Sequence, residues 1–142
     1  MYHPMSAGEQ QTFLRDPVRP AILSTVRADG RPHAAPIWYD LDNEVIVFTT
    51  GASTVKGRNL RRDPRVTLCV HDERPPFSFL VVEGEAEISE APDELREWAA
   101  RIGGRYMGQD RADEYGERNG VPGELLVRVR LTRAAGALDI AE

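Results

Sequence analysis

Residues 20–50 read PAILSTVRADGRPHAAPIWYDLDNEVIVFTT, which is three apolar runs separated by turn residues. Asp29-Gly30 lies between the first two runs, and this dipeptide supplies the positive φ angles that a tight hairpin turn needs. Asp42-Asn43 precedes the third run, which is rich in valine, isoleucine and phenylalanine, the residue types favoured in strands. The stretch therefore predicts three antiparallel strands in a meander.

Further strands are expected on the C-terminal side of this stretch. Residues 65–72, RVTLCVHD, are rich in β-forming side chains. Residues 77–90, FSFLVVEGEAEISE, alternate apolar side chains with glutamates, which predicts a strand with one face in a core and one in water. Gly84 in the middle of this strand predicts a bend or bulge. Residues 123–132, GELLVRVRLT, alternate in the same way, and their arginines are expected to face the glutamates.

Helix signals occur at the two ends of this β-rich region. Ser6, with Glu9 three residues later, has the spacing of a capping box and predicts a short helix over residues 7–15. Pro92 followed by two carboxylates predicts another helix start, and a further short helix is expected within residues 110–120. Together the elements predict a small antiparallel β-barrel of six or seven strands with two or three short helices, because closing the sheet removes exposed edges.

Length and composition narrow the class of protein. The chain of 142 residues fits one domain, residues 1–142. No apolar run approaches the roughly 20 residues of a membrane-spanning helix, and no export signal is visible. One cysteine cannot form an internal disulfide, which agrees with a reducing compartment, and the formal net charge of -5 argues against nucleic-acid binding. We expect a cytoplasmic protein with neither membrane nor nucleic-acid partners.

One basic segment stands out in this acidic chain, TTGASTVKGRNLRRDPRV at residues 49–66. Ser53 or Thr54 can cap a helix that begins near Val55, and the free N–H groups of a helix start suit a phosphate or a carboxylate. Lys56, the only lysine of the chain, adds an ammonium group to that first turn. The neighbouring hydroxyl donors are Thr49, Thr50 and Ser53.

Two further features of the basic segment limit its interpretation. Gly57 costs about 1 kcal/mol relative to alanine inside a helix, so its presence predicts close packing against the backbone there. For the arginines, a solvated helix face paired with nearby carboxylates is the alternative to anion binding. The segment lacks the GxxxxGK[ST] order of a phosphate-binding P-loop, which argues against a nucleoside triphosphatase.

Outside the basic segment no side chain shows a catalytic or metal-binding pattern. The three histidines, His3, His33 and His71, lack the spacing of a metal site, and no nucleophile signature is visible. Cys69 lies within an apolar strand and is expected in the core, because a buried thiol behaves as a small hydrophobe. Trp38 could point into the barrel or toward a ligand, and both alternatives stay open.

Three blocks of sequence resemble a known family: residues 22–50, residues 56–70 (KGRNLRRDPRVTLCV) and residues 79–88 (FLVVEGEAEI). With the last strand they make the chain similar to the pyridoxamine 5'-phosphate-oxidase-like split β-barrel family. The branch that it most resembles is the deazaflavin-dependent oxidoreductases, which use coenzyme F420. This resemblance implies a mainly β (α+β) split barrel of the FMN-binding type. It also implies a homodimer with two cofactor sites in clefts between the subunits.

The resemblance further implies where the cofactor binds. Its ring would lie against the second strand, at Pro36, Ile37 and Trp38. Its phosphate and tail would be held around Thr49, Thr50, Ser53 and Lys56, with Arg58 or Arg61 further out. Phe77 and Phe79 would reach the ring from the partner subunit. The chain has Thr54 where some deazaflavin-binding relatives carry a second basic residue, and it has Phe77 and Phe79 where many relatives have tryptophan or tyrosine. FMN is therefore the alternative cofactor.

The function implied by the resemblance is transfer of hydride between the deazaflavin and a small conjugated substrate. An FMN oxidoreductase of the pyridoxamine phosphate oxidase or flavin reductase type is one alternative. A non-enzymatic split barrel that binds flavin or haem is another. Tyr39, His33 or solvent could protonate the product, and no catalytic residue is assigned.

Overall fold

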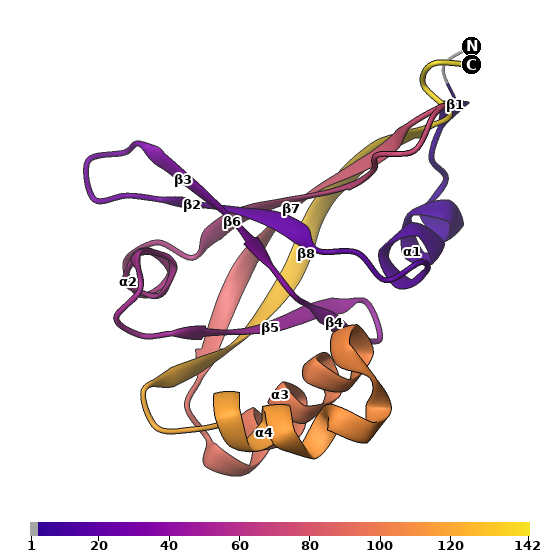
Figure 1. The fold of residues 1–142 in the computed structure, drawn as a ribbon. Helices are drawn as coiled ribbons and strands as arrows, with labels where there is room; N and C mark the ends of the chain where they lie inside the picture. Colours follow the sequence, from indigo (N-terminus) through magenta and orange to yellow (C-terminus); the bar gives the residue numbers. More distant parts are fainter. Residues whose placement is uncertain (1–2) are drawn as a thin grey trace.

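The computed structural model describes residues 3–142, which form eight β-strands, four α-helices and one short 3₁₀-helix (Figure 1). In chain order the elements are β1 (His3–Pro4), α1 (Ala7–Arg15), β2 (Ala21–Val26), β3 (Pro32–Ile37), β4 (Asp40–Asp42), β5 (Val45–Gly51), α2 (Val55–Arg62), β6 (Arg65–Asp72), β7 (Ser78–Ser89), α3 (Pro92–Met107), η1 (Gln109–Arg111), α4 (Ala112–Asn119) and β8 (Glu124–Leu138). The expected helix over residues 7–15 and its capping box are confirmed. The helix expected to begin near Val55 is confirmed as α2, but the prediction of two or three short helices is wrong, because residues 3–142 form four α-helices and α3 is 16 residues long.

All eight strands belong to one antiparallel sheet with the order β3-β2-β6-β7-β8-β5-β4, and β1 pairs with β8 beside this path. The prediction of six or seven strands closed into a barrel is therefore wrong. The sheet stays open because β3 and β4 form its two edges without pairing with each other. Pro32 and Pro36 lack the N–H that a second ladder would need, which confines β3 to an edge. The additional strands β1 and β4 have two and three residues, too few for a periodic pattern.

The chain crosses from one edge of the sheet to the other through only two residues, Trp38 and Tyr39. Because three peptide units span at most roughly 10 Å, the sheet must curl until its edges lie close together. The predicted meander is half right: β2 pairs with β3, but β5 pairs with β4 and β8. The predicted hairpin between β2 and β3 is confirmed, but its loop spans residues 27–31, and of Asp29 and Gly30 only Gly30 has a positive φ, 89°.

The longest ladder pairs β7 with β8, and its register shifts at Gly84, as the bulge prediction required. A side chain at Gly84 would collide with the carbonyl of Arg130. On the outer face, Arg130 pairs with Glu85 at 3.0 Å, which confirms the expected pairing of arginines with the glutamate row. Arg128 instead pairs with Glu94 of α3 at 3.3 Å. This pair helps to hold α3 against the sheet.

The main hydrophobic core fills the inside of the curled sheet and includes Leu14 of α1. Cys69 is not part of this core: it is half-buried on the outer face, because its neighbours Leu68 and Val70 take the inward positions of β6. A second cluster fixes α3 on the outer face of β5 and consists of Val47, Leu95, Trp98 and Leu126. None of the helices within residues 3–142 is long and apolar enough to cross a bilayer.

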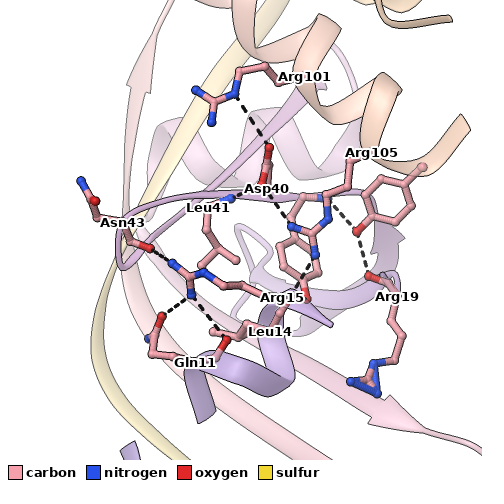
Figure 2. A network of polar contacts seen from close by, with 11 residues as sticks. Gln11, Leu14, Arg15, Arg19, Asp40, Leu41, Asn43, Arg101 and Arg105 are labelled. Atoms are coloured by element: carbon pink, nitrogen blue, oxygen red, sulfur yellow. Dashed lines mark hydrogen bonds and ion pairs between the residues drawn. The ribbon is translucent and has the colours of Figure 1, made fainter. Parts of the chain in front are cut away.

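A polar network joins α1, β4 and α3 (Figure 2). Asp40 at the start of β4 accepts a hydrogen bond from Arg105 of α3 (3.1 Å) and lies 4.0 Å from Arg101. Arg105 also donates to the Leu14 carbonyl in the last turn of α1 (2.9 Å). α3 and α4 lie beside β5 at one end of the molecule, whereas β1 and the C-terminus lie at the other end (Figure 1).

Candidate functional site

A cleft of about 610 Å³ opens where the end of β3, the end of β5 and the first turn of α2 face the α3–α4 pair. Its lining residues are Pro20, Pro36, Ile37, Trp38, Thr49, Thr50, Gly51, Thr54, Lys56, Ala99, Ile102, Tyr115, Arg118 and Asn119. The cleft is apolar beside β3 and α3, and it is polar beside α2 and the end of α4. It therefore suits a ligand that has a flat apolar part and a charged part.

Several residues predicted to contact a cofactor line this one cleft, although they come from two separate strands and a helix. They are Pro36, Ile37, Trp38, Thr49, Thr50 and Lys56. The structure brings them together because β3 and β5 are linked through Trp38 and the short strand β4. That these residues bind a cofactor stays a prediction.

Thr54 organises the polar end of the cleft. Its hydroxyl accepts a hydrogen bond from the Gly57 amide (3.1 Å) and donates to the Gly51 carbonyl (2.8 Å), so Thr54 rather than Ser53 caps α2. A side chain at Gly57 would collide with the backbone of Gly51, which confirms the predicted close packing. The first amides of a helix have no intrahelical acceptor. In α2 these amides lie at the end of the helix that lines the cleft.

The charges at the polar end are unbalanced. Lys56 and Arg118 both line the cleft, and neither forms an ion pair with any other residue in the described range 3–142. Glu124 lies behind this wall, where it pairs with Gly51 across β8 and β5, and its Oε2 is buried without a hydrogen-bond partner among these residues. Burial raises the pKa of Glu124, and the nearby Lys56 ammonium opposes that shift. The cleft therefore presents a net positive end.

Aromatic side chains form the wall at the apolar end. The Trp38 ring stacks on Tyr106 of α3, with centroids 5.0 Å apart and planes at 4°, and meets Tyr115 of α4 edge-on at 5.8 Å. The Tyr106 hydroxyl donates to the Arg19 carbonyl (2.7 Å) and accepts from the Tyr39 amide (3.2 Å), which holds the stack in place. Of the two alternatives for Trp38, the structure takes the one that turns it outward to the cleft.

Five predicted cofactor residues do not line the cleft within one chain: Ser53, Arg58, Arg61, Phe77 and Phe79. Ser53 and Arg58 are exposed on the outer side of α2, and Arg61 pairs with Glu90 at 3.0 Å. Phe79 at the start of β7 pairs with the end of β8, which is the end of the molecule that carries β1 (Figure 1). Phe77 and Phe79 could meet a cleft only if it belonged to a second copy of the chain, as predicted for them.

Sequence reasoning missed the contribution of α3 and α4 to the cleft. Ala99, Ile102, Tyr115, Arg118 and Asn119 come from these helices. Their helical spacing was visible, but no local pattern says where a helix pair will dock. A partial signal was the position of Arg118 and Asn119 directly before Gly120, a glycine that marks the end of the helix.

The two side chains considered as proton donors lie away from the cleft. Tyr39 is fully buried, and its hydroxyl donates to the Leu14 carbonyl at 2.7 Å. Burial raises the pKa of Tyr39 to about 12. His33 pairs with Thr25 across β3 and β2, and its Nδ1 is buried without a partner among residues 3–142. Neither group lines the cleft, so neither is placed to protonate a ligand there.

Comparisons with known proteins agree with this architecture. Residues 7–135 match the family model described as pyridoxamine 5'-phosphate oxidase. A conserved hypothetical protein from Mycobacterium tuberculosis is similar with a TM-score of 0.83 and 28% identity, over 95% of this chain and 86% of that one. An F420 reductase is similar with a TM-score of 0.68 and 30% identity, over 87% and 94% of the two chains. A haem storage protein from Vibrio cholerae, 20% identical with a TM-score of 0.71 over 91% and 92%, shares the fold.

Proposed function

The chain belongs to the pyridoxamine 5'-phosphate oxidase family, and from this premise we propose that it is an oxidoreductase that uses coenzyme F420. The proposed reaction passes hydride between this deazaflavin, bound in the cleft, and a small conjugated substrate. The 30% identity to an F420 reductase supports this choice of cofactor. The observation that carries the proposal is the unpaired ammonium group of Lys56 in the first turn of α2, inside a cleft that also has an apolar wall.

The polar end of the cleft fits a phosphate group. The first amides of α2, the Thr49 hydroxyl and the ammonium of Lys56 are donors on the same wall, whereas the Thr50 hydroxyl, which also lines it, donates to Thr54 at 3.3 Å. A helix start favours an anion through its free N–H groups and its partial positive charge. A charge-assisted hydrogen bond from the ammonium adds about 1.5–3 kcal/mol. These donors have no competing carboxylate on the lining of the cleft.

The apolar end fits the ring system of the cofactor. Pro36, Ile37 and Trp38 form one side of it, and Ile102 of α3 forms another. Because β3 is an edge strand, its outward N–H and C=O groups are free to hydrogen-bond to the polar edge of a flavin-type ring. When bound, the reduced deazaflavin supplies two electrons as hydride to an electron-poor substrate. The protein's role is then to orient the ring and substrate and to exclude water.

The lining of the cleft suggests the source of the proton. The lining residues include no carboxylate and no histidine, and the buried Tyr39 lies elsewhere. We therefore assign protonation of the product to water that enters from the open side. No side chain of the cleft then needs to act as a general acid.

A homodimer is part of the proposal, and an apolar row on the outer face of the sheet supports it. Ile22 lies opposite Pro36 on one side and Cys69 on the other, Cys69 lies opposite Val81, and Val81 lies opposite Ala135. The row thus crosses five strands, and the Ile22 side chain is 39% exposed. Such a patch is typical of a surface that another chain covers. Because Pro36 also lines the cleft, a partner seated on the row would reach the cofactor.

Phe77 supports the same arrangement. Its φ of 67° is unusual for a bulky residue, and hydrogen bonds from its amide to Arg74 and from Ile140 to its carbonyl hold it there. Its ring nevertheless stays 43% exposed. Backbone outliers of this kind are kept where they serve a function, and we assign this ring to the cleft of the partner. Sedimentation equilibrium is expected to give two copies per particle, and a monomer at saturating cofactor would contradict the assignment.

FMN is the second candidate cofactor, because it carries one phosphate and the cleft has Thr54 where some deazaflavin-binding relatives have a second cation. Haem is less suitable, since no histidine, cysteine or methionine lines the cleft. Titration of the protein with coenzyme F420 and FMN side by side, followed by tryptophan fluorescence, tests the choice. We expect tighter binding of coenzyme F420 and quenching of Trp38. A protein that is purified with the absorbance bands of FMN and does not bind the deazaflavin would favour the alternative.

A further inference from the structure

We propose that Arg118, together with Asn119, forms a second anion subsite across the cleft from Lys56. The subsite takes a carboxylate from the acidic tail that coenzyme F420 carries beyond its phosphate. This inference rests on the proposed function and replaces the role predicted for Arg58 or Arg61. Four observations support it: the position of Arg118, its rigid support, its lack of a partner, and the occupation of the arginines on α2.

Arg118 lies at the polar end of the cleft, in the last turn of α4. The loop that follows α4 is tied to the loop before α2, because the Ala52 amide donates to the Gly123 carbonyl at 2.8 Å. The next residue of β8 pairs with Gly51 at the end of β5. The end of α4 therefore faces the phosphate-binding wall, and Arg118 and Lys56 stand on opposite sides of the same charged end.

The helix that carries Arg118 is held firmly. A side chain at Gly103 of α3 would collide with the Tyr115 ring, and one at Gly116 of α4 would lie about 3.0 Å from the Ala100 Cβ. The two helices thus approach as closely as glycine allows. The Arg118 guanidinium lies 5.6 Å from the centroid of the Tyr115 ring. Contact with an aromatic ring orients a guanidinium while its N–H groups stay available to an anion.

The carboxylates nearest to Arg118 in sequence are already engaged by other arginines. Glu114 pairs with Arg111 at 2.6 Å, and Glu117 pairs with Arg96 of α3 at 3.4 Å. Within the described part of the chain, the Arg118 side chain forms neither an ion pair nor a hydrogen bond, and its attraction to Glu114 is a minor cause of the lowered pKa of that carboxyl, behind Arg111. An arginine that lines a cleft on a rigid helix without a partner is available to an anionic ligand.

None of the three arginines of α2 takes the place of Arg118 in the cleft. Arg61 pairs with Glu90 at 3.0 Å, and Arg62 donates to the Val26 carbonyl at 2.6 Å. Arg58 has no such partner in residues 3–142, but it does not line the cleft. Two cations on opposite walls match a ligand with two separated negative groups. FMN offers only its phosphate, whereas the deazaflavin coenzyme offers a phosphate and the carboxylates of its tail.

Affinity measurements with two ligands test the subsite. The ligands are coenzyme F420 with its full tail and the corresponding deazaflavin 5'-phosphate without a tail. We expect the wild-type protein to bind the tailed form more tightly. Arg118→Ala should weaken binding of the tailed form about tenfold, the scale of one solvent-exposed charge-assisted hydrogen bond, and leave the tail-less form within about twofold. Arg118→Lys should recover part of the loss.

Arg58→Ala is the matched control, because it removes an exposed arginine that does not line the cleft. We expect it to bind both ligands as the wild type does. Equal affinity of wild type and Arg118→Ala for the tailed coenzyme would overturn the inference, as would a loss shared equally by both ligands or a loss found only in Arg58→Ala. Failure of the wild-type protein to bind either ligand would instead overturn the proposed function, so the two failures are distinguishable.

Discussion

Cationic side chains cluster in two regions of the molecule. In one region they are paired with acceptors of the protein, and in the other they are not. Around Asp40, the guanidinium groups of Arg101 and Arg105 meet a carboxylate, and Arg105 also meets the Leu14 carbonyl (Figure 2). In the cleft, the side chains of Lys56 and Arg118 form no ion pair with the described residues, although Lys56 interacts electrostatically with Glu124 and Arg118 with Glu114. The cations of the first region join three elements of the fold. The cations of the second region are available to a ligand.

This difference teaches that the number of cations in a segment is a poor guide to binding. The basic segment drew attention because it concentrates five cations, yet three of them serve the fold. Arg61 pairs with Glu90, Arg62 bonds to a backbone carbonyl, and Arg65 pairs with Asp63 at 2.7 Å. Arg65 lowers the pKa of Asp63 to about 2, as expected for a well-formed pair. The cations that matter for binding are those that remain unpaired in a concave site.

The largest effect is expected from breaking the paired region. Arg105→Met leaves Asp40 without its closest cation and removes a donor to the Leu14 carbonyl, and the Arg105 side chain is only 11% exposed. We expect the free energy of unfolding to fall by about 2–4 kcal/mol, because a buried charge loses its partner. Urea unfolding at pH 7 measures it. Arg58→Met, on the exposed side of α2, is the control and should change stability by less than about 0.5 kcal/mol.

If Arg105→Met unfolded at the same urea concentration as the wild type, the network around Asp40 would not be structural. A loss of cofactor affinity without a loss of stability would be equally damaging. Either result would remove the contrast between the two regions.

A substitution in the unpaired region should have the opposite effect: it should lower the affinity for the ligand and leave the stability nearly unchanged. Lys56→Ala is expected to weaken binding of coenzyme F420 by about 1.5–3 kcal/mol, since the phosphate loses a charge-assisted hydrogen bond. Its free energy of unfolding should change by less than about 1 kcal/mol, because Lys56 forms no ion pair or hydrogen bond with the described residues and only its electrostatic interaction with Glu124 is lost. Isothermal titration and urea unfolding of the same preparation separate the two quantities. An unchanged dissociation constant would show that the phosphate does not lie at the start of α2.

The structural role of Tyr39 can be tested through the pH dependence of the free energy of unfolding. Burial raises its pKa to about 12, so an unfolded tyrosine ionises near 10 while the folded one stays neutral. Its stabilising contribution is therefore complete below pH 10 and is lost as the pH rises from 10 to 12. In Tyr39→Phe we expect a loss of about 1 kcal/mol at pH 7, where Leu14 keeps its bond from Arg105. We also expect alkaline destabilisation smaller by about 2 kcal/mol.

Urea midpoints between pH 8 and pH 11.5 for wild type and Tyr39→Phe provide the measurement. The subtraction removes contributions from other tyrosines, including Tyr106, whose pKa burial also raises. Parallel pH profiles would mean that Tyr39 ionises as freely in the folded state as in the unfolded one.

The elements that depend on neighbouring residues could be predicted from the sequence. The Ser6–Glu9 capping box, the turn at Gly30 and the bulge at Gly84 each rest on contacts within a few positions or one ladder. The open sheet could not be predicted, because a pairing partner is a choice among distant strands. The third apolar run looks like a neighbour of the second, and only the tertiary fold takes it to β8.

The residues of the candidate site also divide into those that could be predicted from the sequence and those that could not. Thr49, Thr50 and Lys56 could be proposed because they follow one another through a strand end and a helix start. Arg118 could not, since its position depends on the docking of α3 against β5. That docking rests on the packing of Trp98 against Val47, residues far apart in the sequence. Periodicity reports that a helix has an apolar face but not which strand the face will cover.

The smallest expected effect concerns Glu124, a carboxylate that interacts with Lys56. Its buried Oε2 has no hydrogen-bond partner in residues 3–142, and the Lys56 ammonium lowers its pKa while burial raises it. The carboxylate and the ammonium therefore interact, and the carboxylate weakens the attraction of the cleft for an anion. Glu124→Gln keeps the shape and removes the charge. We expect it to raise the affinity for coenzyme F420 by about 0.5–1 kcal/mol at pH 7, the scale of a partly exposed ion pair.

The pH dependence of binding completes this test. Burial raises the pKa of Glu124, so the affinities of wild type and Glu124→Gln should converge as the pH falls and Glu124 is protonated, and diverge as the pH rises and Glu124 ionises. Glu90→Gln is the matched control, because Glu90 is exposed and pairs with Arg61 outside the cleft. It should leave affinity unchanged at every pH. Equal affinities of wild type and Glu124→Gln at pH 7 would mean that the anion lies beyond the reach of this carboxylate, and hence away from Lys56.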